Sequence, residues 1–281
     1  MISYLSTLFS YAFMRSALLA GLLVSVACGM VGTLVVLNRI VFISGGIAHA
    51  AYGGVGLAYY FGFDPTLGAV LFSVISSLAM GWVHRKSHAR SDTIIGVMWA
   101  IGMAVGIIFI SLSPGYKADL MSYLFGSILA VSNLDLALML VIALIALVFI
   151  LFFYRTLLAM SFDESFTTVR NLPITAIYLG MITLIGLTVV ISMRVVGLIM
   201  VIALLTIPPA LANLFLKNMK QIMLASVAIS VFFTTVGLIL SYALNLPSGA
   251  VIILLMATAY VLALVGQSLL RRPVSQARGQ R

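Results

Sequence analysis

His49 is the single histidine in a long uncharged stretch of the sequence, and its chemistry makes it the first residue of interest. The stretch runs from Ile40 to Phe63 and is long enough to cross a bilayer. A neutral imidazole is a common ligand of zinc, copper and iron. An ionisable group inside a membrane usually faces a bundle interior or a water-filled path. His49 is therefore a candidate to contact a metal ion, although a histidine hydrogen-bonded to a neighbouring helix accounts for it equally well.

Glycines recur at helical spacing around His49. On a helix, Gly45, His49 and Gly53 lie one turn apart on the same face. A second stripe of small residues runs beside them: Gly46, Ala50 and Gly54. Each glycine costs about 1 kcal/mol relative to alanine in a helix interior, so the five glycines between residues 44 and 56 indicate a purpose. Small residues let membrane helices approach closely, and we expect this helix to pack tightly against a partner.

The composition is that of an integral membrane protein. Of the 281 residues, 63% are hydrophobic and 7% are charged, whereas soluble domains carry about 25% charged residues. The single cysteine, Cys28, excludes an intramolecular disulfide and a cysteine metal cluster. The net charge of +9 is explained by basic loops on one side of a membrane. No nucleic-acid partner is expected, since no nucleic-acid-binding motif accompanies the charge.

Charged residues and turns divide the chain into about nine predicted transmembrane helices. The predicted spans are 16–38, 40–63, 65–83, 93–116, 136–154, 171–193, 195–216 and two within 221–270. The last two are separated by Asn245–Gly249, a cluster of turn-forming residues. The expected fold is an all-α polytopic membrane protein, with a single transmembrane domain over residues 1–270 and a basic cytoplasmic tail over 271–281.

The basic residues predict how the chain is oriented. An odd number of spans places the two ends of the chain on opposite sides of the membrane. With the C-terminus inside, twelve of the fifteen Lys and Arg residues fall in inner loops and the tail, and Arg15, Lys117 and Arg194 remain outside. Loops rich in Lys and Arg stay in the cytoplasm, so we expect the N-terminus outside and the C-terminus inside.

The loop over residues 84–92 contains a second pair of histidines. His84 and His88 would lie one turn apart if the loop were helical, which is a spacing that can bind a metal. Three basic residues in the same loop repel a cation. We therefore expect a solvated cytoplasmic loop here, with Asp92 capping the helix that follows.

The outer segment between the fourth and fifth spans has an apolar middle. Residues 118–131 are predicted to form a surface or re-entrant helix, with Asp119 and Asp135 at its two ends. Either carboxylate is able to attract a cation to the entrance of a path. A plain solvated-loop role is the simpler expectation for each.

The loop between the fifth and sixth spans carries the signals of a short helix. Ser161 and Glu164 form a capping box, and Asp163 also favours the helix N-terminus. Asn171 can adopt the left-handed conformation that ends a helix, and Pro173 stops it. A cytoplasmic helix capped at both ends, over about 161–171, is a rigid object that another protein can hold.

Two adjacent prolines, Pro208 and Pro209, lie near the middle of the seventh span. Paired prolines break helical hydrogen bonds and force a kink. Carbonyl groups freed in this way are tolerated in a membrane only against protein or a cavity. The prolines are consistent with a transport path, although kinks also occur in passive bundles.

These segments together resemble the permeases of metal-ion ABC importers that carry zinc, manganese or iron. The likeness rests on four stretches that occur in the family's order: Ser44–Gly56, Leu124–Leu129, the loop from Asp163 and Glu164 to Leu172 and Pro173, and Leu204–Ala210. The Ala-His-Ala sequence within the glycine-rich second span is its most specific mark. The resemblance covers nearly the whole chain.

The resemblance implies a homodimer of the type II importer fold in the cytoplasmic (inner) membrane. Each copy would be a multi-pass permease with lipid around it. A separate ATPase subunit would dock on a coupling helix, and an external solute-binding protein would deliver the metal. The coupling residues would be Asp163, Glu164, Phe166, Thr167 and Asn171, and the path residues His49, Gly45, Gly53, Pro208 and Pro209. The metal would be cargo, with zinc favoured over manganese or iron, and no cofactor would be bound permanently.

The sequence departs from the family pattern at two places. Many members carry an acid four residues before the histidine, where this chain has Gly45, so a two-ligand site in this helix is not expected. In the coupling loop, Thr167 and Asn171 replace the usual alanine and glycine. Asparagine still suits a left-handed helix end, so the second departure is mild.

The alternative function is a secondary transporter or channel for a cation. Such proteins often carry acids within their spans, and none of the six acidic residues lies in a predicted span here. An intramembrane enzyme is disfavoured because H-E-x-x-H and G-x-S-x-G are absent. The chain also lacks G-x-x-x-x-G-K-[ST], so a partner subunit would have to hydrolyse ATP and this chain is not expected to be an enzyme.

Overall fold

The computed structural model of the chain describes residues 11–86, 91–114, 126, 128, 131–162 and 174–270. The described residues form nine helices, each long and apolar enough to cross a membrane. They are α2 (Ala12–Leu37), α3 (Val41–Phe61), α4 (Pro65–Lys86), α5 (Ser91–Leu112), α7 (Asn133–Phe162), α9 (Ile174–Val196), α10 (Leu198–Phe215), α11 (Met219–Leu244) and α12 (Ser248–Leu270). The predicted all-α fold with nine spans is confirmed.

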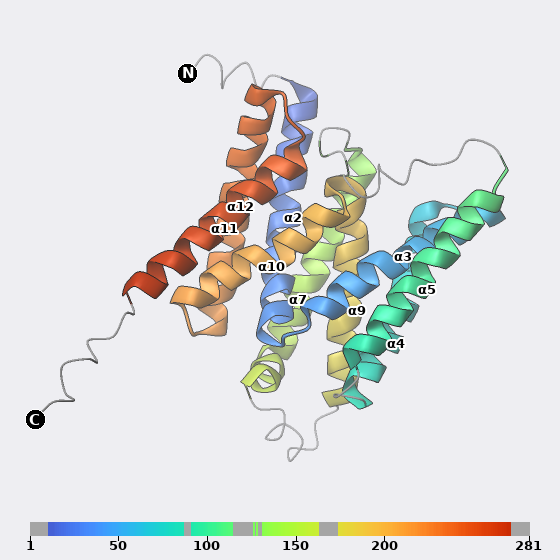
Figure 1. Cartoon of the computed structure of the whole chain (residues 1–281), viewed down its shortest axis with the longest axis horizontal. Coiled ribbons are helices and arrows are strands. Elements are labelled where there is room, and N and C mark those ends of the chain that lie inside the picture. Colours follow the sequence, from blue (N-terminus) through green and yellow to red (C-terminus); the bar gives the residue numbers. More distant parts are fainter. Residues whose placement is uncertain are drawn as a thin grey trace, which may run out of the picture.

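Two groups of helices flank a central set (Figure 1). The helices α3, α4 and α5 pack together on one side, and α10, α11 and α12 on the other. Between them, α2 contacts α7, α9, α10 and α11, while α9 contacts α4 and α10. The central helix α2 is therefore mostly buried, and α3 is buried among α4, α5 and α9.

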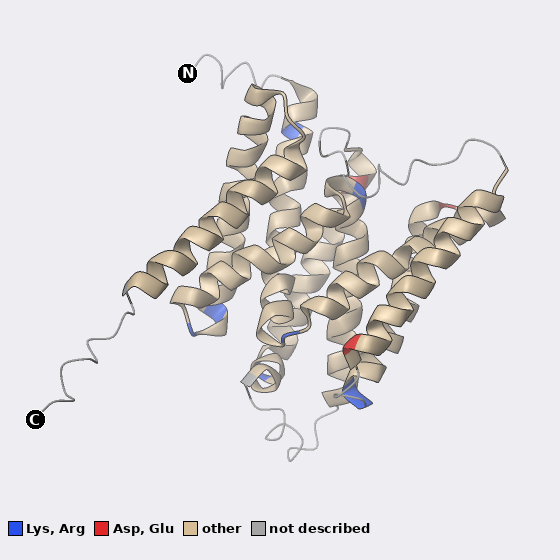
Figure 2. Cartoon of the chain, viewed as in Figure 1, with Lys and Arg blue, Asp and Glu red and all other residues tan. Residues whose placement is uncertain are grey.

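Basic residues gather at the two ends of the helices (Figure 2). Because each helix reverses the chain, one end of the bundle holds these residues: Arg39, Arg85, Lys86, Arg155, Lys217 and Lys220. The opposite end holds Arg15 and Arg194. The asymmetry that the sequence predicts is therefore present in the arrangement of the helices.

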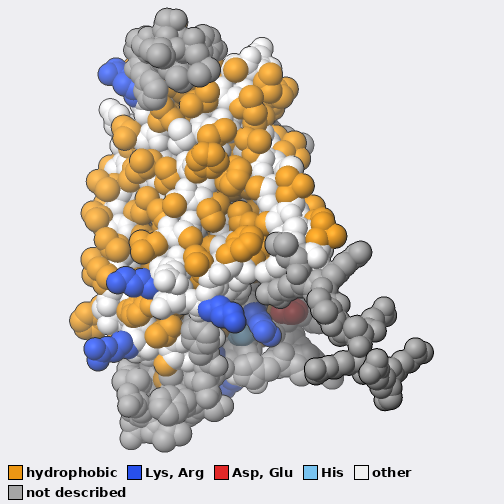
Figure 3. All heavy atoms as spheres, turned by 90° about the vertical axis from the view of Figure 1, so that its left-hand side faces the viewer, with side chains coloured by type: hydrophobic (Ala, Val, Ile, Leu, Met, Phe, Trp, Pro, Cys, Tyr) orange, Lys and Arg blue, Asp and Glu red, His pale blue; other side chains and the backbone are white. Residues whose placement is uncertain are grey.

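The outer faces of the bundle are apolar. On α7 the exposed side chains include Leu144, Val148 and Phe152, and the last of these is 80% exposed. On the face seen in Figure 3, hydrophobic side chains cover the middle and basic side chains lie toward the edges. Soluble proteins rarely expose apolar surface on this scale, so these faces are suited to lipid.

Two turns between helices follow from local sequence. Asp64 accepts hydrogen bonds from the backbone N–H groups of Thr66 (2.8 Å) and Leu67 (3.0 Å) and so caps α4, with Pro65 at its first position. Asn245 adopts a left-handed conformation (φ 55°) that ends α11 before α12 begins at Ser248. The predicted division of the 221–270 segment is thus confirmed.

The helix α7 is longer than the predicted 136–154 span, and this corrects the capping role predicted for Ser161. Ser161 lies in the last turn of α7, where its hydroxyl donates to the carbonyl of Leu157 (2.9 Å) and accepts from the Asn38 amide (3.1 Å). It therefore does not cap a separate helix. The predicted coupling residues lie outside the described residues: Asp163, Glu164, Phe166, Thr167 and Asn171.

The prediction that His84 belongs to a solvated loop is wrong. His84 lies in the last turn of α4, and its Nδ1 is 2.7 Å from the hydroxyl of Tyr178 in α9. The guanidinium of Arg85 lies 5.7 Å from the centre of the same tyrosine ring. His88 lies outside the described residues. In addition, Asp92 lies in the first turn of α5 rather than capping it, because the helix already begins at Ser91.

Candidate functional site

The helix α3 owes its position to its glycines. A side chain at Gly54 would collide with the backbone carbonyl of Gly68 in α4, and one at Gly56 would collide with the backbone of Gly106 in α5. A side chain at Gly102 of α5 would likewise collide with the backbone of Ala50. The predicted tight packing of this helix is confirmed, and two neighbouring helices share it.

The face that carries Gly45, His49 and Gly53 is open at one end and packed at the other. A Cβ atom placed on Gly45 meets no heavy atom within 4 Å. A Cβ atom on Gly53 would lie 2.7 Å from the ring of Phe72 and 3.0 Å from the carbonyl oxygen of Gly102. Open space therefore lies beside Gly45, whereas Gly53 belongs to the packing of α3 on α4 and α5.

His49 is half-buried and lies on an aromatic side chain. Its ring stacks on the indole of Trp99 in α5, with centroids 4.3 Å apart and planes inclined by 17°. The indole N–H of Trp99 donates to the sulfur of Met103 (3.1 Å), which helps to fix the indole. The His49 Nδ1 atom is buried and has no hydrogen-bond partner within the part of the chain that the structure describes. A stack, rather than a bond from Nδ1 to a neighbouring helix, holds this imidazole.

One chain offers a single imidazole at this place. Among the described residues, no group of three or more His, Cys, Asp or Glu side chains is arranged to hold a metal ion. Closed structural zinc sites use four protein ligands. The described residues around His49 therefore do not supply such a ligand set, and the predicted contact of His49 with a metal ion stays a prediction.

The prolines of α10 lie in the hydrophobic core. Pro208 and Pro209 are buried within a helix that continues through both of them. Proline lacks the N–H that would bond the carbonyl four residues earlier, so the carbonyl groups of Leu204 and Leu205 are freed. A Cβ atom on Gly32 of α2 would lie 2.5 Å from the Leu205 oxygen. Protein from α2 thus covers this carbonyl, as a passive kink requires.

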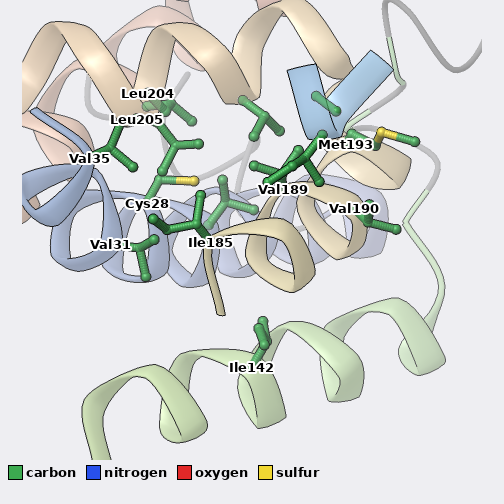
Figure 4. Packing of buried hydrophobic residues seen from close by; sticks show 14 of the residues in the cluster. Cys28, Val31, Val35, Ile142, Ile185, Val189, Val190, Met193, Leu204 and Leu205 are labelled. Carbon is green, nitrogen blue, oxygen red and sulfur yellow. The ribbon is translucent and has the colours of Figure 1, made fainter. Parts of the chain in front are cut away.

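The side chains of Leu204 and Leu205 lie near Cys28 of α2 and Ile185 of α9 (Figure 4). All four are less than 2% exposed. This core joins α2, α9 and α10. The predicted path role of the two prolines stays a prediction.

An ion pair lies at the end of the bundle opposite the basic residues. The Nε atom of Arg194, at the end of α9, lies 3.1 Å from the carboxylate of Asp135 in the first turn of α7. Asp135 is 8% exposed and also accepts from the hydroxyl of Ser132 (2.6 Å). The expectation of a solvated Asp135 is therefore wrong, because the carboxylate is buried and paired. Asp119 lies outside the described residues.

The same arginine reaches the start of α4. Its guanidinium donates to the hydroxyl of Thr66, next to Asp64. The backbone N–H of Leu67 is the main cause that lowers the pKa of Asp64, and Thr66 and the charge of Arg194 add to it. Arg194 thereby links α4, α7 and α9 at one end of the bundle.

Two described residues of the predicted 118–131 segment, Gly126 and Ile128, lie against the bundle. Gly126 (φ 62°) approaches the backbone of Gly197 (φ 82°) so closely that a Cβ atom on Gly126 has no room. Gly197 forms the turn between α9 and α10. Ile128 is 2% exposed and its side chain reaches Gly21 of α2. Most of the predicted 118–131 helix lies outside the described residues.

The model of the ABC 3 transport family matches residues 10–267, which is nearly the whole chain. The chain belongs to the ABC 3 transport family. The resemblance to metal-ion ABC importer permeases is thereby confirmed. Membership favours a permease over the secondary transporter, channel and intramembrane enzyme.

Relatives of the chain agree with this membership over most of their length. An uncharacterized membrane protein of Synechocystis sp. is 53% identical over 90% of both chains. A protein of Halalkalibacterium halodurans named as a manganese transport system membrane protein is 33% identical, over 92% of this chain and 89% of its own. The solved structure of PsaBC from Streptococcus pneumoniae in complex with Fab matches with a TM-score of 0.82 and 29% identity, over 94% of this chain and 95% of that chain.

Within this family member, Trp99 is the residue near His49 that sequence reasoning missed. It lies fifty positions further along the chain, on α5. No spacing rule connects two helices across the small-residue interface of α3. One signal was available: α5 also carries glycines at helical spacing, Gly102 and Gly106, which mark the face that meets α3.

Proposed function

We propose that the chain is the membrane-spanning subunit of an ATP-driven importer for a divalent transition metal, and that His49 lines the translocation path. The observation that carries the proposal is the environment of the imidazole. It lies half-buried in α3, with Nδ1 unbonded among the described residues and open space one turn away at Gly45. The other glycines of α3 are in close contact with neighbouring helices, whereas a Cβ atom placed on Gly45 has no neighbouring heavy atom within 4 Å.

The proposed path lies between two copies of the chain. One copy supplies one imidazole, and a two-fold arrangement would bring a second His49 to the same path. Two neutral imidazoles can share an ion that neither holds alone. Conduction requires that the ion also leaves, so a weak site suits the proposed activity.

The proposed orientation places the end with the basic excess in the cytoplasm of a bacterial cell, with the chain in its cytoplasmic membrane. Six described basic residues lie at that end and two at the other. This bias is the pattern of loops that stay inside. The ion pair of Arg194 and Asp135 then lies at the outer face, where a solute-binding protein would dock.

The ATPase subunit is proposed to hold the segment over 163–171. That segment follows α7, which carries the chain beyond the predicted span as far as Phe162. A helix that continues beyond the predicted span suits the presentation of the segment to a partner. The sequence supports the segment itself, through Asn171 and Pro173 at its end.

Two observations bear on the metal and point to different ions. The imidazole of His49, with glycine in place of an acid at position 45, suits zinc, because manganese prefers oxygen ligands. The Halalkalibacterium relative, however, is named for manganese transport. We give the ligand chemistry of this chain more weight than the name of the relative. We therefore propose zinc first, with manganese and iron as the other cargoes to test.

Reconstitution of the chain with its ATPase and solute-binding partners tests the proposal. ATP hydrolysis should rise when metal-loaded binding protein is added, and the most effective of zinc, manganese and iron identifies the cargo. Thr167→Pro should abolish the stimulated rate, because proline breaks a helix, while the permease still inserts and dimerises. Hydrolysis that no metal stimulates would contradict the proposed function.

A further inference from the structure

A groove on the outer surface of the bundle runs between α2, α7 and α11. Its volume is about 490 Å³. Val26 and Met30 of α2 lie one turn apart at its base, and the other two helices form its walls. The groove involves neither α3 nor α5, so it is separate from the His49 site.

The walls of the groove are two apolar stripes that face each other. On α7 the stripe is Leu147, Ile150 and Leu151, and on α11 it is Met223, Leu224 and Val227. Both follow the spacing of one helix face. Leu151 is 67% exposed and Leu224 is 65% exposed, so the groove opens onto the surface that faces lipid. The methionine side chains at the base and on one wall are themselves flexible, so they can adapt to a flexible hydrocarbon chain in the groove.

One end of the groove is polar and positively charged. Lys220, which is exposed, lies in the first turn of α11, and Tyr154 of α7 lies on the opposite wall. The side chain of Asn218 accepts from the backbone N–H of Lys220 and caps this helix. The positive end of the α11 dipole therefore adds to the charge of the lysine. Tyrosine and lysine toward the ends of membrane helices are typical of the level of lipid headgroups.

We propose that this groove binds an anionic phospholipid from the adjoining leaflet. The phosphate lies at Lys220 and the start of α11, and one acyl chain lies between the α7 and α11 stripes. A lipid fits better than a protein helix because the groove combines an apolar trough with a single cation at its end. An anionic lipid is favoured over a zwitterionic one because the local charge is positive.

Native mass spectrometry of the purified chain tests the proposal with equimolar phosphatidylglycerol and phosphatidylcholine in mixed micelles. The wild-type chain should retain phosphatidylglycerol preferentially. Lys220→Gln should weaken that binding about fivefold, since one lysine near a membrane surface contributes about that factor. Lys86→Gln is the matched control, because it removes the same charge from the end of α4, away from the groove. Its phosphatidylglycerol binding should equal that of the wild type.

A second variant tests the apolar part of the site. Leu151→Trp fills the groove while keeping Lys220, and its exposed position preserves the fold. It should also lose the preference for phosphatidylglycerol. Retained preference in Leu151→Trp, or an equal loss in Lys86→Gln, would show general surface charge and overturn the proposal. A loss of dimer in either groove variant, with lipid binding unchanged, would identify the groove as a protein interface and overturn it as well.

Discussion

At the scale of single residues, the arrangement of His49, Gly45 and Trp99 carries the functional argument. The imidazole lies on a fixed indole, 4.3 Å between ring centroids, and the neighbouring turn of α3 is open at Gly45. The stack orients the ring, and the buried Nδ1 atom has no hydrogen-bond partner among the described residues. Under the proposed function, this nitrogen serves the metal ion, which a hydrogen bond to a neighbouring helix would prevent.

Trp99 should matter for transport through this orientation. Trp99→Ala removes the stack, which is worth about 0.5–1.5 kcal/mol, and metal uptake should fall by up to about tenfold at normal assembly. Trp99→Phe keeps an aromatic face and should retain most of the uptake. Trp82→Ala, on an exposed position of α4, is the control and should transport normally. Equal uptake by Trp99→Ala and wild type would show that the stack has no role.

His49 could be selected from the sequence because its residue type is rare inside a span. Trp99 could not, because its contact depends on how α3 and α5 pack. The prediction for Asp135 was wrong for a related reason. Its carboxylate pairs with Arg194, which lies 59 positions away in the chain, and the Arg194 Nε atom is 3.1 Å from it. Contacts between distant helices are not encoded in local spacing.

At the scale of helices, small residues decide which elements meet. The helix α3 lies against α4 through Gly54 and Gly68, and against α5 through Gly56 and Gly106. The predicted stripe of Gly46, Ala50 and Gly54 identifies this interface correctly, whereas Gly45 of the other stripe meets no neighbouring atom. The ends of the helices were less predictable, since α7 continues past Arg155 to Phe162 and α4 includes His84. Charged residues end the apolar part of a helix but not the helix itself.

Alanine substitutions at two glycines of α3 should differ in their effect on stability, because one glycine is packed against a neighbouring helix and the other faces open space. Gly54→Ala places a methyl group against the backbone of Gly68. Overpacking of this kind costs about 1–3 kcal/mol, so the melting temperature of the purified protein should fall by several degrees. Gly45→Ala is the matched control, because its methyl group meets nothing within 4 Å, and its melting temperature should be unchanged or higher. Equal stability of the two variants would contradict the described packing of α3.

Capping of α4 by the carboxylate of Asp64 should make the stability of the fold depend on pH. The N–H of Leu67 holds its pKa below the ordinary value of 3.8. A lowered pKa means that the carboxylate stabilises the fold above 3.8, and that this contribution is lost as the pH falls through the folded value. Thermal melts from neutral to acidic pH should therefore show a smaller acid-induced loss for Asp64→Asn, which caps without titrating. Identical acid profiles for the variant and the wild type would contradict this role.

At the scale of the whole molecule, the chain is a polytopic member of the ABC 3 transport family, and its described residues form nine helices with the basic residues mostly at one end. The number of spans followed from the sequence because charges and turns interrupt the apolar runs. The pairing of helices around α2 did not, because every predicted span is similarly apolar. The proposed dimer and its partners extend the account beyond the single chain.

Accessibility labelling tests the proposed orientation. Ser87→Cys and Ser165→Cys, in a background where Cys28 is replaced, should react only after the membrane is made permeable, because each follows a helix, α4 or α7, that ends on the basic side. Cys28 itself is fully buried, so its replacement by alanine or serine changes little at the surface. Labelling of either position from outside intact cells would reverse the proposed topology.

The most direct test of the central claim is metal uptake by His49 variants, normalised to assembled complex. His49→Ala and His49→Gln should both stop uptake of radioactive zinc and manganese while assembly stays normal, because glutamine is polar but a much poorer metal ligand. His84→Gln is the control for a structural histidine bonded to Tyr178, and its uptake should follow the amount of assembled protein. Interhelical hydrogen bonds are worth only about 0.6–2 kcal/mol, so complete loss with normal assembly requires a direct role. Near-wild-type uptake by His49→Gln would contradict the account.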